Sequence, residues 1–247
     1  MDFAQSHHSI ELQIRQHEVI ITWGGIIFDE GDIAVWQLAP PVLISYVIVL
    51  LTAFSVHEFA HAWTAYRFGD DTARLNGRLT LNPLAHLDLV GSLMLFVAGF
   101  GWAKPVPVNP YVLQRRSPAA LMWVSLAGPF SNFLMAVLAA VPFRLGWVQF
   151  TGVGGSFLPT LPQFLLIFIS VNIALMLFNL IPLAPLDGEK ILNYFLPPEM
   201  RRVLEFIRPY GWLILMSIFF IGPMLRLDIF GWLIGYPVQV LTLALIG

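Results

Sequence analysis

The sequence predicts an all-α polytopic membrane protein with about five transmembrane helices, one apolar segment that dips into the membrane, and short β-strands outside it. Of its 247 residues, 57% are hydrophobic and only 11% are charged, and its mean hydropathy is +0.76. Soluble domains carry about 25% charged residues, so this composition excludes an ordinary soluble protein. Several apolar runs also reach the roughly 20 residues with which a helix crosses a bilayer.

Residues 1–38 precede the first apolar run and differ from it in pattern. Residues 10–23, IELQIRQHEVIITW, alternate between apolar and polar side chains, and residues 24–36 carry Gly-Gly and Glu-Gly turn signals. We expect one or two short β-strands here, in an exterior segment at the membrane surface. Residues 1–18 lack the cationic start and apolar core of a cleavable signal peptide.

Five apolar runs account for the expected transmembrane helices. They lie at about 41–65, 118–141, 162–181, 203–222 and 229–246. These runs divide the chain into the exterior segment at 1–38, a membrane core at 39–196, and a pair of C-terminal transmembrane helices within 197–247. Polar loops at 67–88 and 103–117 belong to the core.

The segment at 90–102 is apolar but short, and the KPVPVNP sequence that follows it cannot be helical. Cytoplasmic loops of membrane proteins are enriched in Lys and Arg. If the segment turns back, all of the 13 Lys and Arg residues except Arg15, Arg144 and Arg226 share one side of the membrane. A full crossing gives a weaker bias. We therefore expect a re-entrant segment, with residues 1–38 on the exterior side.

The first apolar run contains an ionisable cluster, SVHEFAHAW at residues 55–63. His57 and His61 are four residues apart, so on a helix they lie on one face and can share a metal ion. Glu58 is offset around the helix, where it can take a proton from a water without being a ligand. The pattern H-E-x-x-H on a helix is typical of zinc proteases, and ionisable residues within a membrane are functional candidates.

A third metal ligand must come from elsewhere, because catalytic zinc has three protein ligands and the chain has no cysteine. The best candidate is Asp187, in the sequence NLIPLAPLDGEKIL. It follows an apolar run broken by Pro182 and Pro185, where the backbone must line protein or water. The alternative is that Asp187 caps the N-terminus of a short helix. The re-entrant topology places it on the same side as the histidines, which favours the ligand role.

These motifs resemble the site-2 proteases, which are intramembrane zinc metalloproteases. The resemblance rests on HEFAH at 57–61 and on NLIPLAPLDG at 179–188. SLAGPFSN at 125–132 is similar to the Gly-Pro-x-x-Asn feature of that family, and GRLTLNPLAHLD and GWAKPVPVNP resemble its compact bacterial and archaeal branch. The resemblance covers about residues 40–195.

The resemblance implies roles for individual residues. His57, His61 and Asp187 are expected to bind zinc, and Glu58 is expected to be the general base. Asn179 would hold the peptide or its oxyanion; a helix–helix hydrogen bond is the open alternative. The implied reaction is hydrolysis of peptide bonds in or near transmembrane segments of single-span membrane proteins. It implies a prokaryotic plasma membrane and an active site towards the cytoplasm.

The remaining polar residues receive lesser roles. Asn132 is expected to be structural, with Gly128 and Pro129 allowing close approach of helices. We expect His86 to be a turn or cap residue rather than a ligand. We assign no role to the N-terminal histidines His7, His8 and His17. The β-prone loop sequences RLTLN and KPVPV would hold an unwound substrate strand by edge pairing.

Two other functions fit the same buried cluster. A metal-ion transporter would use it for transit, but the sequence shows no internal repeat and Glu58 has no task there. A non-catalytic relative would only bind membrane segments, and the intact Glu58 argues against it. The net charge of −2 gives no basic field for nucleic acid, so the expected partners are membrane proteins and the lipid bilayer.

Overall fold

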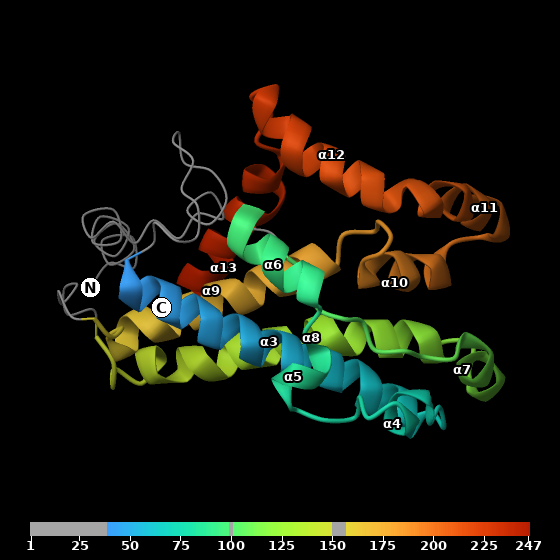
Figure 1. The fold of residues 1–247 in the computed structure, drawn as a ribbon, viewed down its shortest axis with the longest axis horizontal. Coiled ribbons are helices and arrows are strands. Elements are labelled where there is room, and N and C mark those ends of the chain that lie inside the picture. The colour runs from blue at the N-terminus through green and yellow to red at the C-terminus, as the bar shows by residue number, and fades with distance from the viewer. Residues whose placement is uncertain (1–38, 99–100, 150–156) are drawn as a thin grey trace.

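The computed structural model describes residues 39–98, 101–149 and 157–247, which are mostly helical (Figure 1). The strands expected within 1–38, and the N-terminal histidines, lie outside the described residues. Among the described loops there is no β-strand, only an isolated antiparallel bridge between Leu87 and Ala103. The strands expected in these loops are therefore not formed. In KPVPV, Pro105 and Pro107 have no N–H with which to build a ladder.

Three long apolar helices form the core: α3 (Pro40–Arg67), α8 (Ala120–Arg144) and α9 (Leu161–Asn179). They lie side by side, with α3 and α9 both packed against α8 (Figure 1). Many of their fully buried residues are small, among them Ala53, Ala62, Ala65 and Ala136. Small side chains let membrane helices approach closely, since packing rather than the hydrophobic effect drives their association.

Shorter elements surround this core. In chain order they are α4 (Thr72–Leu75), α5 (Pro83–His86), α6 (Leu89–Ala98), α7 (Pro110–Arg116), α10 (Asp187–Phe195), α11 (Pro198–Ile207), the 3₁₀ turn η2 (Arg208–Tyr210), α12 (Gly211–Met224), the π-turn η3 (Gly231–Gly235) and α13 (Tyr236–Ile246). In Figure 1, α4, α7 and α11 lie at the end of the bundle where α3 terminates, and the C-terminus lies at the opposite end.

Four helices are long and apolar enough to cross a membrane: α3, α8, α9 and the continuous stretch Pro198–Met224. Their length and composition support an integral membrane protein and agree with four of the expected spans. The fifth expected span, 229–246, corresponds to the shorter apolar helix Gly231–Ile246. Its buried residues Ile234 and Val238 pack in one hydrophobic cluster with Ile169 and Ile173 of α9.

The apolar segment that begins at α6 returns to the place where it started. The α6 helix has 10 residues, a length of about 15 Å, whereas a bilayer core is about 30 Å thick. Two contacts join the residues before this excursion to those after it. Leu87 forms its bridge with Ala103, and the Lys104 N–H donates to the His86 carbonyl at 2.8 Å. The two ends of the excursion are therefore neighbours, which is compatible with the re-entrant segment expected from the charge distribution.

Thiol labelling tests this arrangement, because the chain contains no cysteine of its own. Leu75 and Tyr111 flank the excursion, Trp147 follows α8, and their side chains are 77%, 80% and 75% exposed. We expect Leu75→Cys and Tyr111→Cys to react with a membrane-impermeant thiol reagent from the same side, and Trp147→Cys from the other. The cysteine-free parent is the control. Labelling of residues 75 and 111 from opposite sides would show that the excursion crosses the membrane.

Candidate metal centre

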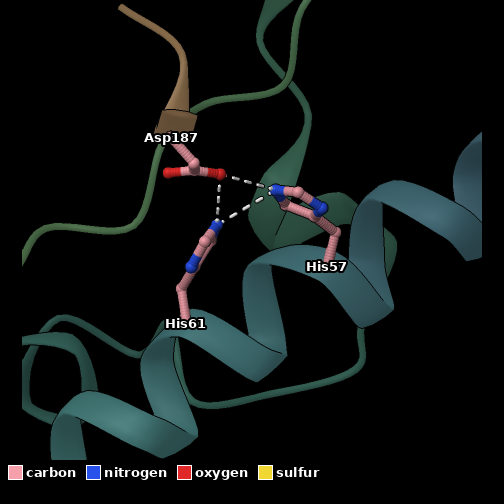
Figure 2. Close-up of side chains that lie close together, drawn as sticks. All are labelled: His57, His61 and Asp187. Atoms are coloured by element: carbon pink, nitrogen blue, oxygen red, sulfur yellow. Dashed lines mark hydrogen bonds and ion pairs between the residues drawn. The ribbon is translucent and has the colours of Figure 1, made fainter. Parts of the chain in front are cut away.

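His57 and His61 from α3 meet Asp187 from the start of α10 (Figure 2). The two Nε2 atoms are 3.0 Å apart, and Asp187 Oδ2 lies 3.3 Å from that of His57 and 3.0 Å from that of His61. All three residues are buried. Tetrahedral zinc with bonds of 2.0–2.1 Å places its ligand atoms about 3.3 Å apart, so the three atoms fit the ion closely.

The local fold brings Asp187 to the histidines by a tight turn after α9. Gly188 lies against the carbonyls of Leu180 and Ile181, where a Cβ atom would collide with the backbone. The N-cap of α10 is Leu186, and Asp187 is already helical. The capping role that the sequence allowed for Asp187 is therefore wrong, and its carboxylate points at the histidines instead (Figure 2).

A chain of amide hydrogen bonds fixes the tautomer of His57. The Phe168 carbonyl can only accept, so the atom of Asn172 that lies 2.8 Å from it is the donor Nδ2. The Oδ1 atom of Asn172 therefore faces Asn132, whose Nδ2 donates to it at 2.9 Å. Asn132 Oδ1 then faces His57 Nδ1 at 2.6 Å, so Nδ1 is the donor. In the neutral imidazole, His57 therefore has its hydrogen on Nδ1 and a lone pair on Nε2, the form that binds a metal.

The neutral form of His61 is fixed in the same way. Its Nδ1 donates to the Val124 carbonyl at 2.7 Å, which leaves a lone pair on Nε2. Two nitrogen lone pairs and a carboxylate oxygen thus face one another in a buried site, an arrangement that calls for a cation. Histidines bound to metals almost always donate their other N–H to an acceptor of this kind.

The remaining contacts of the ligands complete the cluster. Lys190 Nζ lies 3.5 Å from Asp187 Oδ1, the carboxylate oxygen that faces away from the histidines. Gly128 of α8 leaves room for both rings: a Cβ atom there would lie 2.6 Å from His57 Nε2 and would also collide with His61 Nε2. The close helix approach expected at Gly128 is confirmed, and its purpose is to accommodate the imidazoles.

Glu58 lies beside the cluster without belonging to it. Its carboxylate is buried and accepts a hydrogen bond from the Val106 N–H, with 2.9 Å between Oε2 and N. Glu58 and all three ligands line a cavity of about 670 Å³. Apolar side chains of α3, α9 and α12 form its other walls, among them Leu43, Val171 and Leu215. The space next to the metal centre is therefore mostly apolar, with the ionisable groups at one end.

The structure also places the other residues that the sequence singled out. Asn179 lines the cavity, and its Nδ2 donates to the Leu175 carbonyl of its own helix at 2.9 Å; within the described residues it makes no hydrogen bond to another helix. His86 lies apart from the metal cluster, at the end of α5, with its Nε2 2.8 Å from the Thr80 carbonyl. Of the two β-prone loop sequences, only KPVPV borders the cavity.

Sequence reasoning missed several residues that support the ligands. Asn132 was expected to be structural, yet it contacts His57 directly; Asn172 and Lys190 were not considered at all. A usable signal existed for the two asparagines, since polar side chains within apolar spans need partners there. No sequence signal marks the Val124 carbonyl or the Val106 N–H, because every residue except proline carries these groups.

Comparison with known proteins also indicates a zinc metalloprotease. The sequence model of peptidase family M50 matches residues 146–221. A Bacillus subtilis protein named "Putative zinc metalloprotease YwhC" is 43% identical over 173 residues, which cover 70% of this chain and 78% of that protein. Mycobacterium tuberculosis "Putative zinc metalloprotease Rip2" is 32% identical over 191 residues, covering 75% and 68% respectively. No solved structure matches the chain.

Replacing Gly128 with alanine should prevent metal binding. The added methyl group would occupy the space next to both coordinating nitrogens, so we expect the zinc content of Gly128→Ala to fall well below about one ion per chain. Metal analysis of the purified protein measures this. Gly235→Ala is the matched control, since a Cβ atom there would lie 4.0 Å from its nearest neighbour, an ordinary contact. Full zinc content in Gly128→Ala would contradict the site.

Removing the Asn132 amide should weaken metal binding without abolishing it. Asn132→Ala frees the His57 ring to rotate and to change tautomer, and loss of such a partner costs about 10- to 100-fold in metal affinity. Competition with a chromogenic chelator measures the affinity. Ser170→Ala, at a buried hydroxyl paired with Thr242 rather than with the ligands, is the control. An unchanged affinity would show that Asn132 only packs the helices.

Proposed function

Because this chain belongs to peptidase family M50 and is an intramembrane zinc metalloprotease, we propose that His57, His61 and Asp187 hold its zinc and that Glu58 is the general base. The observation that carries this proposal is the convergence of two histidine Nε2 atoms and an Asp187 oxygen, with both rings held through Nδ1, beside the separate carboxylate of Glu58. These residues stand at one end of an apolar cavity that extends into the membrane-spanning bundle.

The chemistry divides between the ion and the residues of the chain. Bound zinc supplies Lewis acidity that lowers the pKa of a water molecule and polarises the scissile carbonyl. Glu58 takes a proton from that water and later delivers it to the leaving amine. Asn179 lines the cavity, and its Nδ2 has one hydrogen left over for a substrate carbonyl or oxyanion. Lys190 Nζ holds the outer oxygen of Asp187.

The substrates are membrane proteins, which the family implies, and we extend this to single-span proteins. A transmembrane helix hides its amides in its own hydrogen bonds, so it must unwind before hydrolysis. Side chains from Leu43 to Phe54 form an apolar stripe along α3 that leads to His57, and this stripe would receive the helical part of a substrate. The segment from Ala103 to Val108 borders the same cavity, where it would pair with the unwound part.

The proposed topology puts the metal centre towards the cytoplasm and residues 1–38 outside. In support, the excursion through α6 returns to its origin, so most Lys and Arg residues share the face that carries α4, α7 and α11 (Figure 1). Five crossings remain part of this proposal, with Gly231–Ile246 as the fifth. So does the division into an exterior segment, a catalytic membrane core at 39–196 and a C-terminal helix pair.

The two alternative functions, a metal-ion transporter and a non-catalytic relative, can be distinguished from a protease. The relatives described above are named as zinc metalloproteases, and neither is named as a transporter. A non-catalytic relative would tolerate loss of Glu58 without any change in its behaviour. The role of Glu58 in turnover is therefore the property to test.

The decisive experiment measures zinc and peptide hydrolysis together. We expect wild-type protein to hold about one zinc ion per chain, and Asp187→Ala and His61→Ala to lose it because each removes one of three ligands. Glu58→Gln should keep its zinc yet lose about 10²- to 10⁴-fold in turnover of a reconstituted membrane segment, the usual contribution of a general base. Chelation should stop the wild type, and added zinc should restore it.

Three results would count against the proposal. Full zinc content in Asp187→Ala would mean that the third ligand has been misassigned. Zinc-free wild type after reconstitution would remove the proposed metal site altogether. Undiminished cleavage by Glu58→Gln would assign the proton transfer to another group.

A further inference from the structure

The backbone amides of residues 104–109 are held from three directions beside the metal centre. The Lys104 N–H donates to the His86 carbonyl at 2.8 Å. The Val106 N–H donates to Glu58 Oε2 at 2.9 Å. The Asn109 N–H donates to Asp70 Oδ2 at 2.6 Å. This segment therefore touches the proposed general base at its middle and is anchored on both sides of that contact.

Asp70, which holds the Asn109 end of the segment, is itself fixed in place. Asp70 is almost completely buried, and its other oxygen accepts from the Thr72 N–H at 3.0 Å and from the Thr72 hydroxyl at 2.5 Å. Asn109 also caps α7, since its side chain accepts from the Tyr111 N–H. The loop between α3 and α5 does not border the cavity, but through Asp70 and His86 it fixes the segment that does.

The sequence of the segment restricts its backbone still further. Pro105 and Pro107 flank Val106, and a residue that precedes proline is confined to extended conformations. Neither proline has an amide hydrogen, so Val106 provides the N–H group between them. The direction of that N–H bond is consequently set by covalent structure as well as by the anchors.

Glu58 needs such a constraint. Its side chain has several rotatable bonds and lies next to His57 in sequence, yet it must stay off the metal and hold one oxygen ready for a water. An N–H donor to a carboxylate makes a strong, charge-assisted bond. The Val106 N–H donates to Oε2, which makes Oε1 the more basic oxygen and the better proton acceptor.

We propose that the backbone N–H of Val106 is a positioning group for catalysis, which orients the Glu58 carboxylate towards the reacting water. The inference rests on the proposed function of Glu58 and deepens it. It predicts that removal of one hydrogen atom from the backbone slows proton transfer while the metal ligands and the substrate cavity stay intact.

The test compares Val106→Pro with Val106→Ala. Proline removes the N–H at a position already confined to extended backbone, whereas alanine shortens the side chain and keeps the N–H. We expect Val106→Pro to lower kcat about 10- to 100-fold, the effect of misplacing a catalytic group by about 1 Å. Its zinc content and KM should match those of Val106→Ala, which loses the same side chain but keeps the N–H, and its kcat should lie well below that of Val106→Ala. A purely structural role would alter KM or zinc content instead.

Hydrogen exchange provides a readout that is independent of activity. In a peptide covering residues 105–108, the two prolines have no amide hydrogen, so the signal comes from Val106 and Val108 alone. We expect the Val106 amide to be protected in the wild type and to exchange faster in Glu58→Ala, which removes its acceptor. Equal exchange in the two proteins would show that the hydrogen bond does not form.

The outcomes separate this inference from the proposed function. If the wild type cleaves and Val106→Pro cleaves at the same rate or faster, the positioning role is overturned while the protease mechanism stands. If the wild type cleaves no membrane segment, the proposed function fails and this inference fails with it. Should Val106→Pro lose its zinc or its fold, an amide-to-ester substitution at Val106 removes the same hydrogen and keeps the side chain, and its kcat decides.

Discussion

Two histidine Nε2 atoms and a carboxylate oxygen face one another in the interior of this protein, and the rest of the structure is arranged to keep them there. His57 and His61 each use Nδ1 as a donor to a fixed acceptor, so both Nε2 lone pairs point at the Asp187 carboxylate. In an apolar bundle such an arrangement would be costly without a cation, because a buried charge needs a partner. Under the proposed function, a zinc ion would turn this mutual repulsion into coordination. The metal would then stabilise the packing of the site as well as take part in the chemistry.

The same helix contacts build the fold and the metal centre. The α3 helix carries two ligands and Glu58, and α8 supplies both acceptors for their Nδ1 atoms as well as the gap at Gly128. The α9 helix contributes Asn172, which fixes Asn132, and the turn after it delivers Asp187. A shift of α8 along α3 would therefore disturb ring orientation and metal geometry together. Hydrogen bonds in a low-dielectric interior are strong enough to resist such a shift.

Sequence reasoning reached those parts of the site that depend on side-chain type and short spacing. The four-residue spacing of His57 and His61 is visible in the sequence. Asp187 lies 130 residues from His57, but the prolines before it and the distribution of Lys and Arg predicted that it lies on the same side of the membrane as the histidines. The contacts of His57 with Asn132 and of Glu58 with Val106 join residues 75 and 48 positions apart, and no local pattern encodes either. The fifth apolar run was recognised by hydropathy alone, which does not show that Gly231–Gly235 forms a π-turn before α13. Strands were expected in the loops from residue alternation, but in KPVPV half of that alternation consists of prolines.

The segment from Ala103 to Asn109 shows how a loop without regular structure can still be specific. Its Lys104, Val106 and Asn109 amides already have acceptors within the protein, and its two prolines have none to offer. The groups of the segment that could still bond to a substrate backbone are therefore mostly carbonyl oxygens, and Pro105 and Val106 line the cavity. A helix that unwinds exposes N–H groups that have lost their own acceptors, and these carbonyls can receive them. Under the proposed function, the prolines therefore serve two purposes: they confine the backbone that orients Glu58, and they leave acceptors rather than donors for the unwound substrate.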